Sequence, residues 1–106
     1  MADRTVLITG CSSGIGRDAA FALRERGWRV FAACRREADC AALRAEGFES
    51  PRVDYEDPAS IAEGAGAALE AARGRIGALF NHGAYAVPGF LEDLPTEALR
   101  ANFEAN

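Results

Sequence analysis

The sequence has 106 residues, 49% of them hydrophobic and 26% charged, which is typical of one globular domain. Its formal net charge of −4 argues against nonspecific nucleic-acid binding, which needs a basic surface. No apolar run approaches the ~20 residues of a membrane-spanning helix, and the first residues lack a secretory signal. We therefore expect one cytoplasmic domain over residues 1–106, without membrane or nucleic-acid partners. Cys11, Cys34 and Cys40 lack a paired spacing, which predicts reduced thiols.

The first half of the sequence predicts two strands, each followed by a helix. The apolar, β-branched run at 5–9 is typical of a buried strand. Apolar residues then recur at helical spacing over 14–26, and Gly27 is a common C-terminal stop. Residues 29–34 predict the second strand, and 36–46 the second helix.

The second half predicts two more strands and two more helices in alternation. The strands are expected over 50–54, where Pro51 weakens the pattern, and over 75–81. One helix is expected from Asp57, which can cap it, to about residue 73, because proline is tolerated at the first helical position. The other helix begins near Thr96.

This alternation predicts an α/β fold with a Rossmann-like, doubly wound parallel sheet and helices on both faces. Right-handed crossovers give the strand order 3-2-1-4, with the sheet truncated after its fourth strand. A ligand crevice is expected beyond the carboxyl ends of the first and fourth strands, where the winding direction switches.

A glycine-rich turn joins the first strand to the first helix. Gly10 allows a tight turn, and the missing side chains of Gly14 and Gly16 let a phosphate group approach main-chain N–H groups at the helix N-terminus. Ser12 and Ser13 add hydroxyl donors. Because the turn follows a strand and opens a helix, we interpret it as a pyrophosphate site; the alternative is an ordinary tight turn.

Two arginines follow the second strand, where dinucleotide-binding proteins place the residue that contacts the adenosine ribose. An acidic residue there accepts from the 2′-hydroxyl of NAD, whereas arginine accommodates the 2′-phosphate of NADP. Here Arg35 and Arg36 precede Glu37. The sequence therefore favours NADP(H), with NAD(H) the second choice. Alternatively both arginines are solvated charges, although cations are disfavoured near a helix N-terminus that has no anion.

Three segments together form a pattern typical of one family. They are the turn at 9–16, Asp54 after the third strand, and Asn81-His82-Gly83-Ala84 after the fourth. With these segments the sequence resembles the classical branch of the short-chain dehydrogenase/reductase family over essentially its whole length. The family's motif after the fourth strand is Asn-Asn-Ala-Gly, and this sequence departs from it at the last three positions.

The resemblance implies a role for each matching residue. The turn that holds the pyrophosphate comprises Gly10, Ser12, Ser13, Gly14, Ile15 and Gly16, with Ile15 near the nicotinamide half. Arg35 would meet the 2′-phosphate and Asp54 would accept from the adenine amino group. The Tyr55 main chain would contact the adenine ring, while Asn81 and Gly83 would line the ribose.

The resemblance also implies hydride transfer between a small carbonyl compound and its alcohol. Asn106 matches the family's catalytic asparagine. The family's tyrosine has a lysine four residues later, but neither Tyr55 nor Tyr85 has one, and the sequence contains no lysine. We therefore expect the NADP(H)-binding front half of an oxidoreductase that is inactive as an isolated chain. The alternative is a nucleotide-binding or interaction fragment without redox activity.

The single histidine, an acidic segment and the edge of the sheet each lead to a further expectation. His82, the single histidine, is interpreted as a packed or hydrogen-bonded loop residue rather than a catalytic one. Helix capping and adenine recognition account for two carboxylates of segment 54–57, so no metal site is expected. The open edge of the fourth strand predicts self-association, because unpaired strand edges invite pairing.

Overall fold

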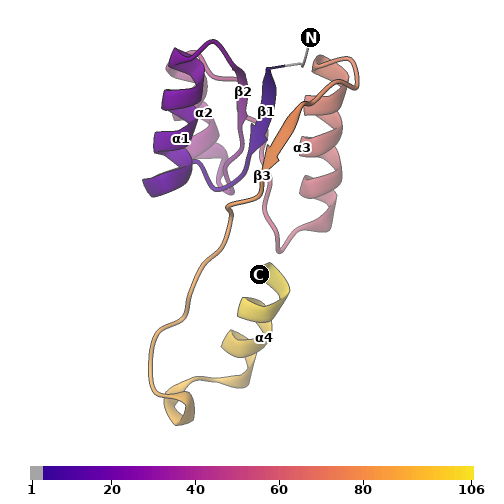
Figure 1. The fold of residues 1–106 in the computed structure, drawn as a ribbon. Coiled ribbons are helices and arrows are strands. Elements are labelled where there is room, and N and C mark those ends of the chain that lie inside the picture. Colours follow the sequence, from indigo (N-terminus) through magenta and orange to yellow (C-terminus); the bar gives the residue numbers. More distant parts are fainter. Residues whose placement is uncertain (1–3) are drawn as a thin grey trace.

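The computed structural model describes residues 4–106, so the start of the expected 1–106 domain, residues 1–3, lies outside the described residues. The elements in chain order are β1 (Thr5–Ile8), α1 (Gly14–Glu25), β2 (Arg29–Ala32), α2 (Glu37–Ala45), α3 (Pro58–Ala71), β3 (Ala78–Phe80), a short 3-10 helix (Leu91–Asp93) and α4 (Thr96–Ala105). Helices α1 and α2 cover one face of the sheet and α3 the other, while α4 lies beyond the carboxyl ends of the strands (Figure 1). Within residues 4–106, no helix is both long and apolar enough to cross a membrane.

The sheet is parallel and its three strands have the order β2-β1-β3. Val6 of β1 pairs with Val30 of β2 and with Ala78 of β3. The α/β class and the parallel sheet are thus confirmed, and so is the 2-1-4 part of the predicted strand order. The predicted third strand over 50–54 is wrong as a continuous strand, because this part of the chain forms only the isolated parallel bridges Phe31↔Glu49 and Cys34↔Arg52.

Pro51 explains why the third strand is interrupted. The Ala32 N–H donates to the Glu49 carbonyl at 2.8 Å, as in a parallel ladder. The next bond would run from the N–H of residue 51 to the Ala32 carbonyl, but proline has no N–H. The buried Ser50 hydroxyl makes this bond instead, with its Oγ donating to the Ala32 carbonyl at 2.6 Å. A side chain thus replaces the missing main-chain donor.

We expect Ser50→Ala to lower the free energy of unfolding by about 1–3 kcal/mol, because a buried carbonyl loses its donor. The Ser50→Ala, Pro51→Ala double variant regains part of this loss, since alanine restores an N–H at position 51. Urea unfolding followed by circular dichroism measures both effects. A Ser50→Ala variant as stable as the wild type, or a double variant without any recovery, would contradict this account of the interrupted strand.

The core has one cluster on each face of the sheet, because successive strand residues point to opposite sides. Val6 and Ile8 pack under α1 and α2, whereas Leu7 packs with Phe31 under α3. All three cysteines are free and buried in the first cluster: Cys11, Cys34 and Cys40. Burial raises the pKa of the Cys11 and Cys34 thiols to about 12, so both remain protonated at neutral pH.

Helix α3 begins as the sequence predicts. The Asp57 side chain accepts from the Ser60 N–H, and Pro58 occupies the first turn. Arg52 donates to Asp57 at 3.2 Å, and this hydrogen bond, together with the bond from the Ser60 N–H and the positive charge of Arg52, lowers the pKa of that carboxyl. At Gly64 the helix lies so close to the interrupted strand that a Cβ would sit 2.4 Å from the Arg52 carbonyl oxygen. The cap and this contact set where α3 lies against the sheet.

Candidate functional site

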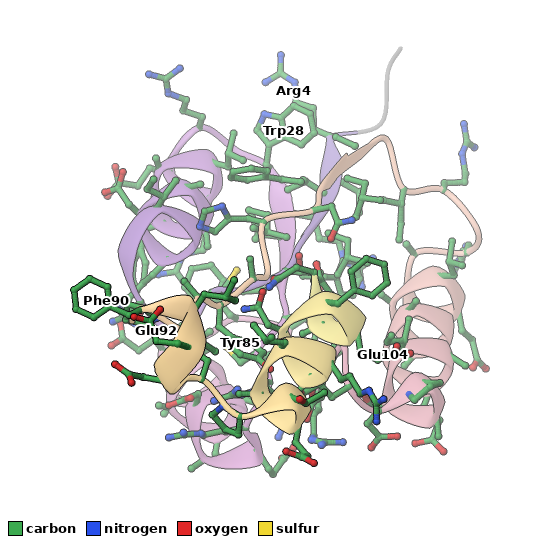
Figure 2. The ribbon with its side chains drawn as sticks, turned by 90° about the horizontal axis from the view of Figure 1, so that it is seen from below. Arg4, Trp28, Tyr85, Phe90, Glu92 and Glu104 are labelled. Carbon is green, nitrogen blue, oxygen red and sulfur yellow. The ribbon has the colours of Figure 1, made fainter. Side chains whose placement is uncertain are left out.

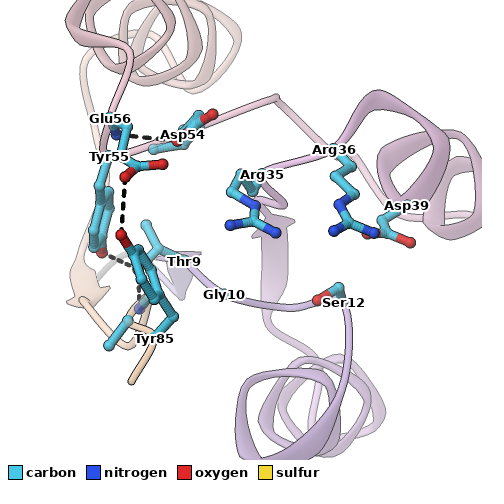
Figure 3. Close-up of a pocket in the computed structure, with 13 residues that line it drawn as sticks. Thr9, Gly10, Ser12, Arg35, Arg36, Asp39, Asp54, Tyr55, Glu56 and Tyr85 are labelled. Carbon is cyan, nitrogen blue, oxygen red and sulfur yellow. Dashed lines mark hydrogen bonds between the residues drawn. The ribbon is translucent and has the colours of Figure 1, made fainter. Parts of the chain in front are cut away.

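A cavity of about 320 Å³ lies at the carboxyl ends of the strands, at the predicted position of the ligand crevice (Figure 3). Six of the residues predicted to bind the cofactor line it: Gly10, Ser12, Arg35, Asp54, Tyr55 and Gly83. They come from four segments that are distant in the sequence. The fold therefore brings together residues that follow β1, β2, the interrupted strand and β3.

The glycine turn leads from this cavity to the N-terminus of α1. Gly10 and Gly14 have φ angles of +70° and +61°, a left-handed conformation that favours glycine. A Cβ on Gly16 would lie 2.3 Å from the Gly10 carbonyl oxygen, so the turn packs directly against the helix. Ser13 makes no side-chain cap bond, and no acidic residue occupies the first turn of α1. The N–H groups of that turn have no acceptors within the helix, which suits an anion.

Space for such an anion lies next to Gly14, where a Cβ would meet no atom within 4 Å. Ile15 is 67% exposed in the same turn. The residues Ser13, Gly14, Ile15 and Gly16 do not line the 320 Å³ cavity but follow Ser12, which does. The cavity and the α1 N-terminus thus form adjacent parts of one candidate site.

Thr9 connects the segments of the site; the sequence placed it in the turn at 9–16 but gave it no role of its own. Its buried Oγ1 accepts from the N–H groups of His82 and Gly83 at 2.9 and 3.0 Å. The same atom lies 2.7 Å from the Tyr55 hydroxyl, which also hydrogen-bonds to Asn81 Oδ1. The only sequence signal was a polar residue closing a buried apolar strand. Through Thr9, β1 holds the loops after β3 and after the interrupted strand.

Tyr55 also explains a departure from the family's motif. A Cβ on Gly83 would lie 2.9 Å from the Tyr55 ring, so this ring leaves no room for the alanine that the family usually has there. His82 packs with its ring centroid 5.2 Å from that of Phe80, in agreement with a packed loop residue. The packing of the Tyr55 ring therefore accounts for the departure from the motif at position 83.

Charges of both signs line the cavity: Arg35, Arg36 and Asp39 on one side, and Asp54 and Glu56 on the other. Arg35 and Arg36 are exposed at the end of β2, and within residues 4–106 neither guanidinium makes an ion pair. On the opposite side, Asp54 accepts from the Glu56 N–H at 3.0 Å and pairs with Arg52 at 3.4 Å. An anion is favoured near the two arginines, and hydrogen-bond donors are favoured near Asp54.

Tyr85 closes another side of the cavity. Its hydroxyl donates to Glu56 Oε1 at 3.0 Å, and the pKa of the phenol is raised by burial and by this carboxylate. The Tyr85 N–H donates to Asn106 Oδ1 at 3.1 Å, while Asn106 Nδ2 donates back to the Tyr85 carbonyl at 2.7 Å. Asn102 Nδ2 donates to the same carbonyl at 2.9 Å. Seen from below, Tyr85 lies beside α4, whereas Phe90 projects outward (Figure 2).

Asn81 and Asn106 do not line the cavity that holds the arginines. They line a second hollow, of about 440 Å³, together with residues of α3, β3 and α4. Thr9, Val53 and Tyr55 line both hollows. The catalytic role suggested for Asn106 stays a prediction, because its amide is paired at both ends with the Tyr85 main chain.

Comparisons with known proteins define the class to which this fold and site belong. The sequence model of the family described as "short chain dehydrogenase" matches residues 4–106. The chain therefore belongs to the short-chain dehydrogenase family of oxidoreductases.

Individual relatives agree with this assignment. The chain is 31% identical over 103 residues to the uncharacterized oxidoreductase YbbO of Escherichia coli (strain K12), covering 97% of the chain and 38% of that protein. It is similar to a variant of actinorhodin polyketide ketoreductase with NADPH, at a TM-score of 0.81 and 28% identity, covering 99% of the chain and 43% of the ketoreductase. A short-chain dehydrogenase/reductase from Burkholderia phymatum in complex with NAD gives a TM-score of 0.82 and 31% identity, covering 98% of the chain and 39% of that protein. The chain thus spans less than half the length of these relatives.

Proposed function

We propose that the chain binds NADP(H) and provides the nucleotide-binding half of an oxidoreductase that interconverts a small carbonyl compound and its alcohol. The observation that carries the proposal is the pair of guanidiniums at Arg35 and Arg36, which line the cavity without ion-pair partners among residues 4–106. A 2′-phosphate between them would supply the missing anion. NAD(H) lacks this group and is the second choice.

The rest of the site fits a dinucleotide. In our proposal the pyrophosphate lies against the α1 N-terminus, where Gly14 is open and Ser13 has no cap bond. Asp54 accepts from the adenine amino group, the Tyr55 main chain contacts the ring, and Gly83 lines the ribose. Asn81, predicted to line the ribose as well, lies in the second hollow and supports this wall of the site through its hydrogen bond with Tyr55. When bound, a nicotinamide cofactor supplies or accepts the hydride, and the protein residues hold and orient it.

Titration calorimetry with NADPH and NADH tests the cofactor proposal. We expect NADPH to bind at least about tenfold more tightly, because the 2′-phosphate gains charge-assisted hydrogen bonds. Equal affinities for the two cofactors would contradict the assignment of the arginines. Absence of binding for both would contradict the nucleotide site itself.

We further infer that the 106-residue chain alone binds NADPH without turning it over. The sequence contains no lysine, so no tyrosine here has the lysine that the family uses to lower its pKa. Incubation with NADPH and small aldehydes or ketones should leave the nicotinamide absorbance unchanged. Oxidation of NADPH with formation of the alcohol would contradict this inference.

The three buried free thiols favour a reducing compartment such as the cytoplasm.

We also infer that the chain associates with itself through β3 and α4. Leu79 and Phe80 of β3 are 64% and 37% exposed, and Phe103 of α4 is 84% exposed. Apolar side chains beside an unpaired strand edge favour pairing between copies. Light scattering at micromolar concentration should give more than the monomer mass, and Leu79→Lys should return it to the monomer. A monomeric wild type would contradict this inference.

A further inference from the structure

Hydrogen bonds hold Tyr85 both at its main chain and at its side-chain hydroxyl. Its main chain is held by Asn102 of α4 and by Asn106, directly after α4, through three hydrogen bonds of 2.7 to 3.1 Å. Its hydroxyl donates to Glu56, which follows the interrupted strand. The side chain therefore spans from the loop after β3 to a second loop and is only partly exposed. A ring fixed in this way loses little conformational freedom when a ligand binds.

The Tyr85 ring faces the same cavity as Arg35. Both residues line it, and Figure 3 shows the Tyr85 ring and the Arg35 guanidinium facing the same space, with Ser12 on the far side of Arg35. Because the Tyr85 hydroxyl is already bonded to Glu56, its contribution to a ligand is the face of the ring rather than a hydrogen bond. Planar heterocyclic bases stack well on the face of an aromatic side chain.

We propose that Tyr85 recognises the base of the nucleotide by stacking against the adenine ring, and that Glu56 is the positioning residue that holds Tyr85 in place. This inference rests on the proposed nucleotide site and deepens it. The inference assigns phosphate binding and base recognition to different residues of that site. The α1 N-terminus and the arginines bind phosphate groups, whereas Tyr85 distinguishes a ligand that carries a base from one that does not.

The test compares two probes by titration calorimetry: 2′,5′-ADP, which carries adenine, and inorganic pyrophosphate, which does not. Tyr85→Ala should weaken 2′,5′-ADP about tenfold, the usual scale for losing one aromatic stacking partner. It should leave pyrophosphate binding unchanged. A merely structural role for Tyr85 would weaken both probes together.

Variants that retain the aromatic ring of Tyr85 distinguish stacking by the ring from its positioning by Glu56. Tyr85→Phe and Glu56→Ala both remove the hydroxyl–carboxylate bond, so each should weaken 2′,5′-ADP by the same smaller factor, and the double variant should lose no more. Glu56→Gln retains an acceptor oxygen and should bind like the wild type. These variants keep the inference testable even where Tyr85→Ala does not fold.

Three results would overturn the inference. The first is a Tyr85→Ala variant that binds 2′,5′-ADP like the wild type. The second is equal loss of both probes in any of these variants. The third is a wild type that binds pyrophosphate but not 2′,5′-ADP, which would leave the phosphate site intact and reject the base site. A wild type that binds neither probe would overturn the proposed function together with this inference.

Discussion

Replacing Gly16 by alanine is expected to lower the free energy of unfolding by about 3 kcal/mol and to abolish nucleotide binding. The new Cβ would lie 2.3 Å from the Gly10 carbonyl oxygen and 2.9 Å from the Gly10 carbonyl carbon. Both are main-chain atoms of the glycine turn, so no side-chain rotation relieves the clash. Either α1 or the turn must move, and the N–H groups of α1 are then no longer aligned with the cavity. Urea unfolding and NADPH calorimetry measure the two effects.

Gly66 in α3 provides a matched control. It is also a helical glycine, but a Cβ there would meet no atom within 4 Å. Gly66→Ala should therefore leave the protein as stable as the wild type or stabilise it by about 0.5–1 kcal/mol, since alanine is the better helix former. If the two variants behaved alike, the close contact between the turn and α1 would not be the reason for glycine at position 16.

Charge reversal at Arg35 is expected to have the largest effect on cofactor choice. Arg35→Glu should weaken NADPH on the order of a hundredfold, because a favourable charged hydrogen bond is replaced by repulsion of the 2′-phosphate. NADH has only a hydroxyl at this position, and a carboxylate can accept from it. The affinity for NADH should therefore remain the same or rise, so the preference for NADPH over NADH is lost or reversed.

Arg26→Glu makes the same change in net charge at an exposed position at the other end of α1. This control should leave both affinities unchanged at physiological ionic strength, because screening weakens interactions beyond about 8 Å. If Arg26→Glu weakened NADPH as strongly as Arg35→Glu, the effect would come from net charge rather than from contact with the phosphate.

Most of the fold could be predicted from the sequence because its signals are local. Apolar strand residues, helical spacing and the Asp57-Pro58 start of α3 depend on neighbours within a few positions. The exception was the strand expected over 50–54. Pro51 gave a warning, but the substitution of the Ser50 hydroxyl for a main-chain donor depends on Ala32, 18 positions earlier.

The candidate site likewise contains residues that could be proposed from the sequence and contacts that could not. Gly10, Gly14 and Arg35 could be proposed from the sequence because their residue types carry meaning at a strand end or a helix start. The contacts of Thr9 with Tyr55, and of Tyr85 with Glu56, join residues 46 and 29 positions apart. No spacing rule predicts such contacts, because they depend on how the loops at the sheet edge fold against one another.

We propose that one nucleotide site extends from the α1 N-terminus to the arginines after β2. Amide chemical-shift mapping of the ¹⁵N-labelled chain during titration with NADPH tests it most directly. We expect the largest saturable shifts in segments 10–16, 35–36 and 54–56, with smaller changes in α3. Shifts confined to the second hollow around Leu79 and Ile61, or no saturable shifts, would contradict the claim.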